Sequence, residues 1–297
     1  MRAVPRQGPQ GPSMTAFIAA FAGFARPAAL VATTLAAAVV PAAADGILTA
    51  KYVLSVGGVE IGRANVVVQA SDATFEIAAT GKITGILRAV SSGKGTVASR
   101  GAMNAGKPAP QVFAVSTDTD GKAEGIRIGF VGTSVKELEV EPPPKPLPDR
   151  VEVTDAHKVN VIDPLSGAFV PMPGTGDMLV PAACNRTIAV FDGRQRFDIA
   201  LTYLRTERVK AETGYEGPAV VCRVAYTPVA GHRPTRSTVK YLQANKDMYV
   251  WLVPMAGTRL MAPFRVSVAT VIGTAVFEAT SFDSNATSRT VPITARP

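Results

Sequence analysis

The chain has 297 residues, of which 47% are hydrophobic and 18% are charged, with a formal net charge of +8. This composition excludes an intrinsically disordered chain and supplies enough apolar side chains for a buried core. The basic residues form no clustered stripe, so we expect no nucleic-acid partner.

Residues 1–44 are predicted to be a signal peptide rather than part of the fold. Basic residues but no acidic ones precede Asp45, and the apolar run "AALVATTLAAAVV" covers 28–40. The small residues of "PAAAD" that follow are typical of a signal-peptidase site. A retained anchor is the alternative, but the run is shorter than the roughly 20 residues that a spanning helix needs. We therefore expect a periplasmic protein with no membrane span after cleavage.

The next part of the chain, 45–140, alternates apolar and polar residues with period two, which predicts an antiparallel half of six or seven strands. Gly57-Gly58 and Asp120-Gly121 are typical of two-residue hairpin turns. The segment 83–90 is expected to be a short helix or an irregular apolar crossing. The predicted strands cover 50–56, 59–70, 74–80, 111–119, 124–130 and 134–140.

A linker and a short helical segment are expected over 141–183. Five of the seven residues from 142 to 148 are proline, which favours an extended, semi-rigid spacer. The residues after it form the only stretch that we predict to be helical, with Thr154 as one capping residue.

A second cap in this segment is Asp163, which precedes a proline suited to the first helical position. A functional alternative pairs Asp163 with Ser166 as an acid and a hydroxyl. The favoured interpretation is a capped helix that buries Leu165 and Phe169.

The last part, 184–283, is again predicted to be antiparallel β-structure. Residues 186–201, "RTIAVFDGRQRFDIAL", form its first hairpin, with Asp192-Gly193 as a tight turn with positive φ angles. Residues 284–297 are expected to be a disordered tail. The further strands are predicted over 218–226, 248–254, 259–271 and 274–282. The predicted fold class is mainly β: two antiparallel curved sheets or half-barrels, with one or two short helices in the connecting region.

Cys184 and Cys222 are the only two cysteines. An even count in an oxidising compartment favours one structural disulfide. A redox pair or a metal site is the alternative, but no CxxC spacing and no cluster of histidines or carboxylates supports either.

Groups for catalysis are scarce. His157 and His232 are the only histidines, and no G-x-S-x-G sequence accompanies them. The stretch "SSGKGT" (91–96) lacks the Ser or Thr that follows the lysine of a P-loop, and "DTDG" (118–121) lacks the later glutamate of a calcium loop. We predict no catalytic residue, no cofactor and no metal site, and therefore a non-enzymatic protein.

Four stretches occur together in one order: "DPLS" from 163, "CNRTIAVFDGRQRFD" from 184, "YEGPAVVCRVAYTPVAGHRP" from 215 and "VWLVPMAG" from 250. In this order the chain resembles the exported bacterial family called domain of unknown function 3108, over most of 50–282. The resemblance implies export, a β-rich fold and the Cys184–Cys222 pair, and it implies no activity. The succession of long strands also looks like the lipoprotein-carrier half-barrels of the periplasm, which wrap a curved sheet around a helix and hold acyl chains.

Two functions remain open. The first is a carrier or sensor of an apolar, lipid-like envelope molecule, with Arg194, Arg196 and Arg265 as contacts to an anionic headgroup. Its structural alternative is that the apolar faces simply fill one another. The second function is an envelope assembly or scaffolding module that binds protein partners through exposed strand edges. Histidine-based catalysis is a third, less favoured possibility.

Overall fold

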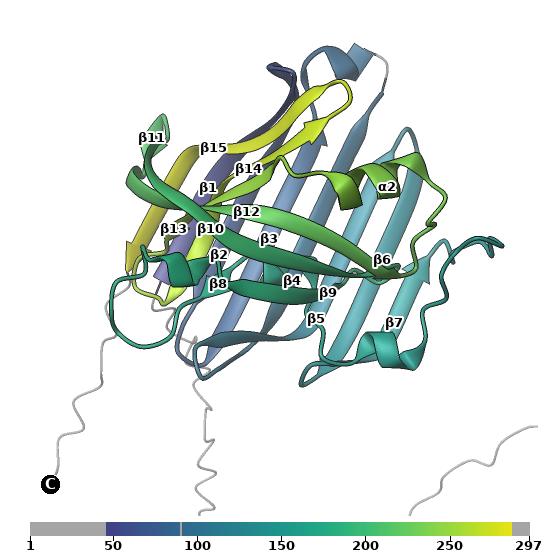
Figure 1. Ribbon diagram of the computed structural model, residues 1–297, viewed down its shortest axis with the longest axis horizontal. Coiled ribbons are helices and arrows are strands. Elements are labelled where there is room, and N and C mark those ends of the chain that lie inside the picture. The colour runs from purple at the N-terminus through teal and green to yellow at the C-terminus, as the bar shows by residue number, and fades with distance from the viewer. Residues whose placement is uncertain (1–45, 90, 287–297) are drawn as a thin grey trace, which may run out of the picture. The chain divides into compact units, whose positions relative to one another are not determined.

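The computed structural model describes residues 46–89 and 91–286, so the predicted signal peptide lies outside the described residues (Figure 1). Seven long strands precede the proline-rich linker, joined by hairpin turns and by one 3-10 helix, η1 (Gly85–Ala89). The strands are β1 (Gly46–Val56), β2 (Val59–Ala70), β3 (Thr74–Ile83), β4 (Gly93–Asn104), β5 (Lys107–Thr119), β6 (Lys122–Val131) and β7 (Ser134–Glu141).

The linker region contains only short elements, and the chain then returns to long strands. The short elements are η2 (Asp155–Lys158), α1 (Pro164–Gly167), β8 (Val170–Pro171) and η3 (Pro181–Ala183). They are followed by β9 (Arg186–Phe191), β10 (Arg196–Lys210), β11 (Thr213–Gly214), β12 (Glu216–Ala230), α2 (Ser237–Ala244), β13 (Met248–Pro254), β14 (Leu260–Thr270) and β15 (Gly273–Ala286).

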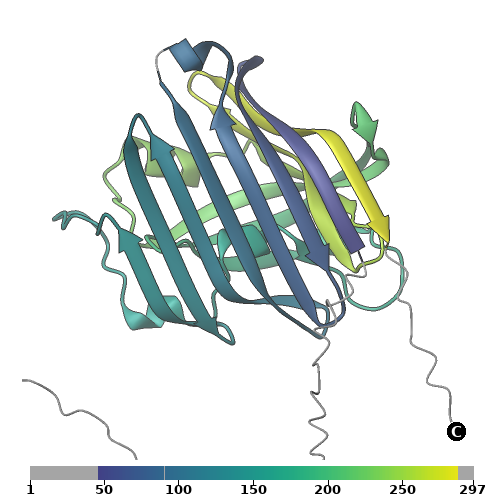
Figure 2. The same ribbon diagram turned by 180° about the vertical axis from the view of Figure 1, so that it is seen from behind.

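All strands of the described residues belong to one 15-stranded sheet, which curves back on itself without closing (Figures 1 and 2). Its main path runs β7-β6-β5-β4-β3-β2-β1-β15-β14-β13-β12-β10-β9. The prediction of a mainly β, antiparallel, curved fold with short helices is confirmed. The two halves form one continuous sheet because β1 pairs with β15 along its whole length, from Gly46 opposite Ala286 to Val56 opposite Ala275.

Two of the predicted hairpin turns have the expected geometry. Gly57 and Gly58 connect β1 to β2, Asp120 and Gly121 connect β5 to β6, and all four have positive φ angles between 51° and 84°. The third turn is longer than predicted. Because β9 ends at Phe191 and β10 begins at Arg196, four residues connect them rather than two.

The four-residue turn is held by the side chain of Asp192. Its carboxylate accepts hydrogen bonds from the backbone N–H groups of Arg194 and Gln195, at 2.7 and 2.6 Å. Gly193 has a positive φ of 94°, whereas Asp192 does not share this conformation. The carboxylate cap therefore replaces the second positive-φ residue of a tight turn.

Three elements differ from the sequence-based expectation. β15 continues to Ala286, so residues 284–286, which were expected to belong to a disordered tail, are part of a strand. β4 was not predicted, because Gly93, Gly95 and Ser99 interrupt the period-two pattern of large apolar residues at its inward positions. The expectation that only the linker region is helical is wrong, since α2 lies between β12 and β13. No residue of α2 is buried, so the helix lacks the apolar stripe that would reveal it in the sequence.

The linker segment lies across the space between the two ends of the sheet. Ile162 pairs with Val190 of β9, and Val161 belongs to a cluster with Phe113 and Ile128 on β5 and β6. The linker thus joins strands from both halves of the sheet. Within the described residues, no helix has the length and apolar character needed to cross a membrane.

Candidate functional site

The inner face of the N-terminal strands carries a row of small residues toward the end of the sheet where η1 lies. Ala64 on β2 lies opposite Gly81 on β3, which lies opposite Gly95 on β4 and then Thr117 on β5. Paired residues of antiparallel strands point to the same side of a sheet. This row therefore leaves space inside the curve of the sheet. Larger side chains at the same positions would fill that space.

The C-terminal strands supply the opposing wall with larger apolar residues. Ile188, Ile199, Val224, Val250 and Leu252 come from β9, β10, β12 and β13. The segment from Leu165 to Val170, which includes most of α1, forms a further part of the wall. One wall of small residues thus faces another of branched aliphatic side chains.

Between these walls lies a cavity of about 560 Å³. Among the residues that the structure describes, none of those lining it is charged. The polar side chains that point into it from the inner face are those of Tyr52 and Thr117. The Tyr52 hydroxyl donates a hydrogen bond of 2.7 Å to a backbone carbonyl oxygen of β14, so it is already satisfied. The apolar faces therefore do not fill one another completely, and the cavity suits a ligand without charge in its buried part.

A second apolar hollow of about 410 Å³ continues from the cavity toward η1. The two share Gly81, Gly95 and Phe277 in their linings, and the second adds Leu54 and Leu87. We call this region the mouth of the cavity, because it lies at the end of the sheet where η1 and the turns of β1–β2 and β14–β15 meet.

Beside the cavity, α1 is anchored by a buried polar cluster. Asp163, at 0% exposure, accepts hydrogen bonds from the backbone N–H groups of Leu165 and Ser166, at 3.0 and 2.9 Å. Ser99 of β4 donates to its other oxygen at 2.9 Å, and the hydroxyls of Ser99 and Ser166 are 2.8 Å apart. Burial raises the pKa of Asp163 above its ordinary value, against the lowering effect of these hydrogen bonds. This geometry is that of a capped helix with a buried Ser166.

The disulfide between Cys184 and Cys222 is formed, with the two Cα atoms 5.4 Å apart. It joins the start of the β9 segment to the middle of β12, and both cysteines are fully buried. The prediction of a disulfide is confirmed. Such bonds persist in oxidising compartments.

The three arginines predicted as headgroup contacts each lie close to a carboxylate of the chain itself. Arg194 pairs with Glu124 at 3.2 Å and Arg196 with Asp198 at 2.8 Å. Arg265 lies 3.7 Å from a glutamate of β15, and its guanidinium stacks over the ring of a tryptophan. None of the three lines the cavity. Their role as headgroup contacts stays a prediction, and these ion pairs would have to open for it.

The histidines have structural surroundings. The ring of His157 accepts a hydrogen bond of 3.1 Å from the backbone N–H of Thr154, the N-cap residue of η2. The backbone carbonyl of His232 accepts one from Val151. Asp118 accepts a hydrogen bond from Gly121 N–H, as expected for a hairpin turn. Within the described part of the chain, no group of three or more potential metal ligands lies together.

Some features of the site were not foreseen. The contribution of β4 to the cavity wall and of Ser99 to the buried cluster was missed together with the strand itself. Gly81 and Gly95 stand at inward positions of their strands, and a pair of inward glycines on neighbouring strands is the signal that indicates space inside a sheet.

Fold and site together define a β-protein whose single curved sheet surrounds an apolar cavity. One disulfide connects the segment before β9 to β12. The family model described as "Protein of unknown function (DUF3108)" matches residues 51–280, and the chain belongs to this family. The sequence resemblance to that family is thereby confirmed.

A search of solved structures found the beta-barrel-like protein of domain of unknown function DUF1849 from Brucella abortus, with 8% sequence identity and a TM-score of 0.46. The similarity covers 82% of this chain and 100% of that chain. No curated protein matches the chain.

Proposed function

We propose that this protein is an exported, non-enzymatic protein that binds an apolar, lipid-like molecule in the cavity between the two walls of its sheet. The observation that carries the proposal is the cavity of about 560 Å³, which has no charged residue among the described residues that line it. This volume lies within the range of about 300–1,000 Å³ that is usual for small-molecule sites. An acyl chain fits such a lining because it needs no polar partner.

Export to the periplasm is part of the proposal. The disulfide supports an oxidising compartment. The signal peptide predicted over 1–44 lies outside the described residues, so detection of a mature protein that begins at Asp45 in the periplasmic fraction is its direct test.

The binding proposal is tested by filling the cavity from its wall. A Cβ atom on Gly81 would come no closer than 3.7 Å to any other residue's atoms, so Gly81→Leu can extend a side chain inward without a clash at its base. The control is Gly125→Leu on β6. Gly125 lies opposite Ser116 on the outer face of the sheet, and its Cβ would meet nothing closer than 3.9 Å.

The probe is cis-parinaric acid, a fluorescent acyl chain, added to the purified disulfide-bonded protein. We expect the wild type and Gly125→Leu to enhance its fluorescence equally, and Gly81→Leu to bind at least about tenfold more weakly, a difference of about 1.4 kcal/mol. Equal binding by all three proteins, or no binding by the wild type, would contradict the proposal. Equal melting temperatures of the two variants would exclude misfolding as the cause.

The alternative function, a scaffold that pairs with partners through strand edges, has less support. β7 ends the path of the sheet and bears Lys136, Glu137, Glu139 and Glu141 within eight residues. Charged side chains on an edge strand are a common protection against pairing with another chain. Crosslinking in cells that yields a partner attached to β7 would favour the alternative.

A further inference from the structure

The turn between β14 and β15 presents two aliphatic side chains to solvent. Val271 is 85% exposed and Ile272 is 79% exposed, more than any other large hydrophobic residue that the structure describes. The turn is ordered by the Thr270 hydroxyl, which donates to the Gly273 carbonyl oxygen and accepts from Ile272 N–H. Single exposed apolar residues are ordinary, but two adjacent ones held at a defined tip indicate a contact surface.

This tip lies beside the mouth of the cavity. The Gly57 N–H of the β1–β2 turn donates a 3.0 Å hydrogen bond to the backbone carbonyl oxygen of Thr274, two residues after Ile272. The start of η1 in turn packs against β2, because Gly85 lies against the backbone carbonyl of Glu60. Both ribbon views place η1 and the β14–β15 turn at the same end of the sheet (Figures 1 and 2). We call the β14–β15 turn, the β1–β2 turn and η1 together the rim.

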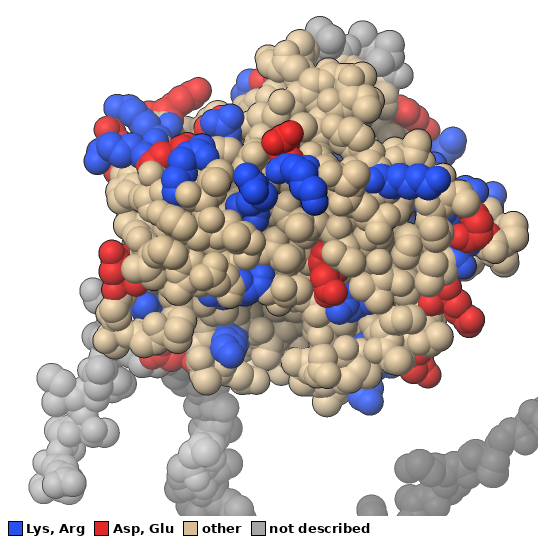
Figure 3. Space-filling model, in the orientation of Figure 1, with Lys and Arg blue, Asp and Glu red and all other residues tan. Residues whose placement is uncertain are grey.

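The rim is apolar at its centre and basic at its sides. Where it faces the viewer in Figure 3, few charged side chains cover it. Arg88 of η1 is exposed on one side, and Lys246 is exposed on the other, next to Asn245, whose amide donates to the end of β14. Neither cation has an ion pair within the described residues.

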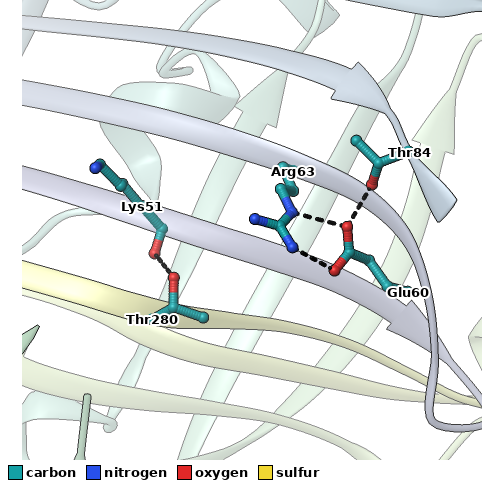
Figure 4. Close-up of polar contacts among 5 residues, drawn as sticks. All are labelled: Lys51, Glu60, Arg63, Thr84 and Thr280. Atoms are coloured by element: carbon teal, nitrogen blue, oxygen red, sulfur yellow. Dashed lines mark hydrogen bonds and ion pairs between the residues drawn. The ribbon is translucent and has the colours of Figure 1, made fainter. Parts of the chain in front are cut away.

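One carboxylate at this surface, Glu60, is paired with an arginine. Glu60 accepts two hydrogen bonds from Arg63, at 2.8 and 2.9 Å, and one from Thr84 at 2.7 Å (Figure 4). Asp247, next to Lys246, is a second carboxylate at this surface and accepts a hydrogen bond of 3.0 Å from the Tyr249 hydroxyl. Among the described residues, the charged ones that line the mouth itself are all basic, namely Arg63, Lys82 and Lys94. Exposed aliphatic side chains flanked by cations match the surface of an anionic bilayer, where apolar groups enter the interface and basic groups meet lipid headgroups.

We propose that the rim docks on an anionic phospholipid bilayer, with Val271 and Ile272 inserted among the lipids and Arg88 and Lys246 over their headgroups. Docking in this orientation turns the mouth of the cavity toward the membrane. The docking itself needs no ligand in the cavity, so it stands apart from the proposed binding function.

Co-sedimentation of the full mature chain with vesicles tests this proposal. The vesicles are phosphatidylcholine alone or phosphatidylcholine with phosphatidylglycerol. We expect binding to the anionic vesicles that weakens with salt, and at least a tenfold loss of binding in the double variant Val271→Asp/Ile272→Asp. The control is Val131→Asp: Val131 is also well exposed, at 67%, but is the last residue of β6, beside the β6–β7 turn at the opposite end of the sheet. It should bind like the wild type.

Arg88→Gln/Lys246→Gln should weaken binding to the anionic vesicles without affecting the binding of cis-parinaric acid. That readout separates the docking from the cavity function, because a variant that fails to fold loses both. Vesicle binding that is absent in the wild type, or equal in the wild type and Val271→Asp/Ile272→Asp, would overturn the proposal. If Val271→Asp/Ile272→Asp changes the oligomeric state but not vesicle binding, the docking proposal is wrong. The two residues would then form a contact between copies of the protein.

Discussion

The buried carboxylate of Asp163 permits a test that separates its capping role from its charge. Asp163→Ala removes the acceptor for two backbone N–H groups of α1 and for the Ser99 hydroxyl. A lost N-cap costs about 1 kcal/mol, and buried groups left without a partner cost about 1–3 kcal/mol more. We therefore expect Asp163→Ala to lower the free energy of unfolding by about 2–4 kcal/mol. Asp163→Asn keeps an oxygen acceptor for the cap and should cost much less.

The charge of Asp163 makes the difference between wild type and Asp163→Asn depend on pH. Burial raises the pKa of the folded carboxyl above its ordinary value of 3.8. A raised pKa means that the folded state retains the proton more readily than the unfolded chain. The contribution of Asp163 to stability is thus fully present below pH 3.8 and is lost as the pH rises through the folded pKa. Asparagine does not titrate. The free energy of unfolding of Asp163→Asn should therefore rise relative to that of the wild type as the pH increases.

Urea denaturation followed by the fluorescence of Trp251, the single and largely buried tryptophan, measures these free energies. The three proteins are compared between about pH 4 and pH 8, the range in which carboxyl linkage acts. Other carboxylates titrate in all of them and cancel in the difference. A difference between wild type and Asp163→Asn that is independent of pH, or a loss in Asp163→Asn as large as in Asp163→Ala, would refute the reasoning.

Three further predictions concern stability and ionisation. Replacing Cys184 and Cys222 by serine should lower the free energy of unfolding by about 4 kcal/mol, the chain-entropy value for a separation of 38 residues. Urea denaturation measures this change, and a loss below about 1 kcal/mol would contradict the prediction. Arg63→Gln should raise the pKa of Glu60 from about 2 toward its ordinary 4.5, because the hydrogen bond from Arg63 is the main cause of the lowered pKa. NMR titration measures this pKa, and an unchanged value would mean that the hydrogen bond from Thr84 causes the lowering. Tyr52→Phe removes a 2.7 Å hydrogen bond and should cost about 1 kcal/mol in thermal or urea unfolding, and a neutral substitution would mean that the hydroxyl contributes nothing net.

Much of the strand pattern could be predicted because alternation is a local property. The expected strands over 59–70 and 248–254 coincide with β2 and β13, and the glycine and Asp-Gly turns mark two hairpins correctly. Where the inward residues are small, alternation carries no hydrophobic signal, and β4 was missed for this reason. α2 was missed because a short surface helix without a buried residue has no apolar periodicity.

The candidate site could be predicted only in its parts. Asp163 was identified as a cap, and the pairing of Cys184 with Cys222 was expected. Ser99, which completes the buried cluster, lies 64 residues before Asp163. No spacing rule connects such distant residues, because their proximity depends on how β4 packs against α1.

The amino-acid sequence by itself determined the β class, most of the turns, the disulfide and the scarcity of catalytic groups, since each depends on residue type or on short-range periodicity. Only the tertiary structure decided that the two β halves join into one sheet through β1 and β15, and that the inner row around Gly81 and Gly95 faces a cavity rather than a filled core. Pairing between strands at opposite ends of the chain and the distance between two walls are properties of the whole sheet. Local preferences do not contain them, because the same alternating strands can bury their apolar faces in more than one arrangement.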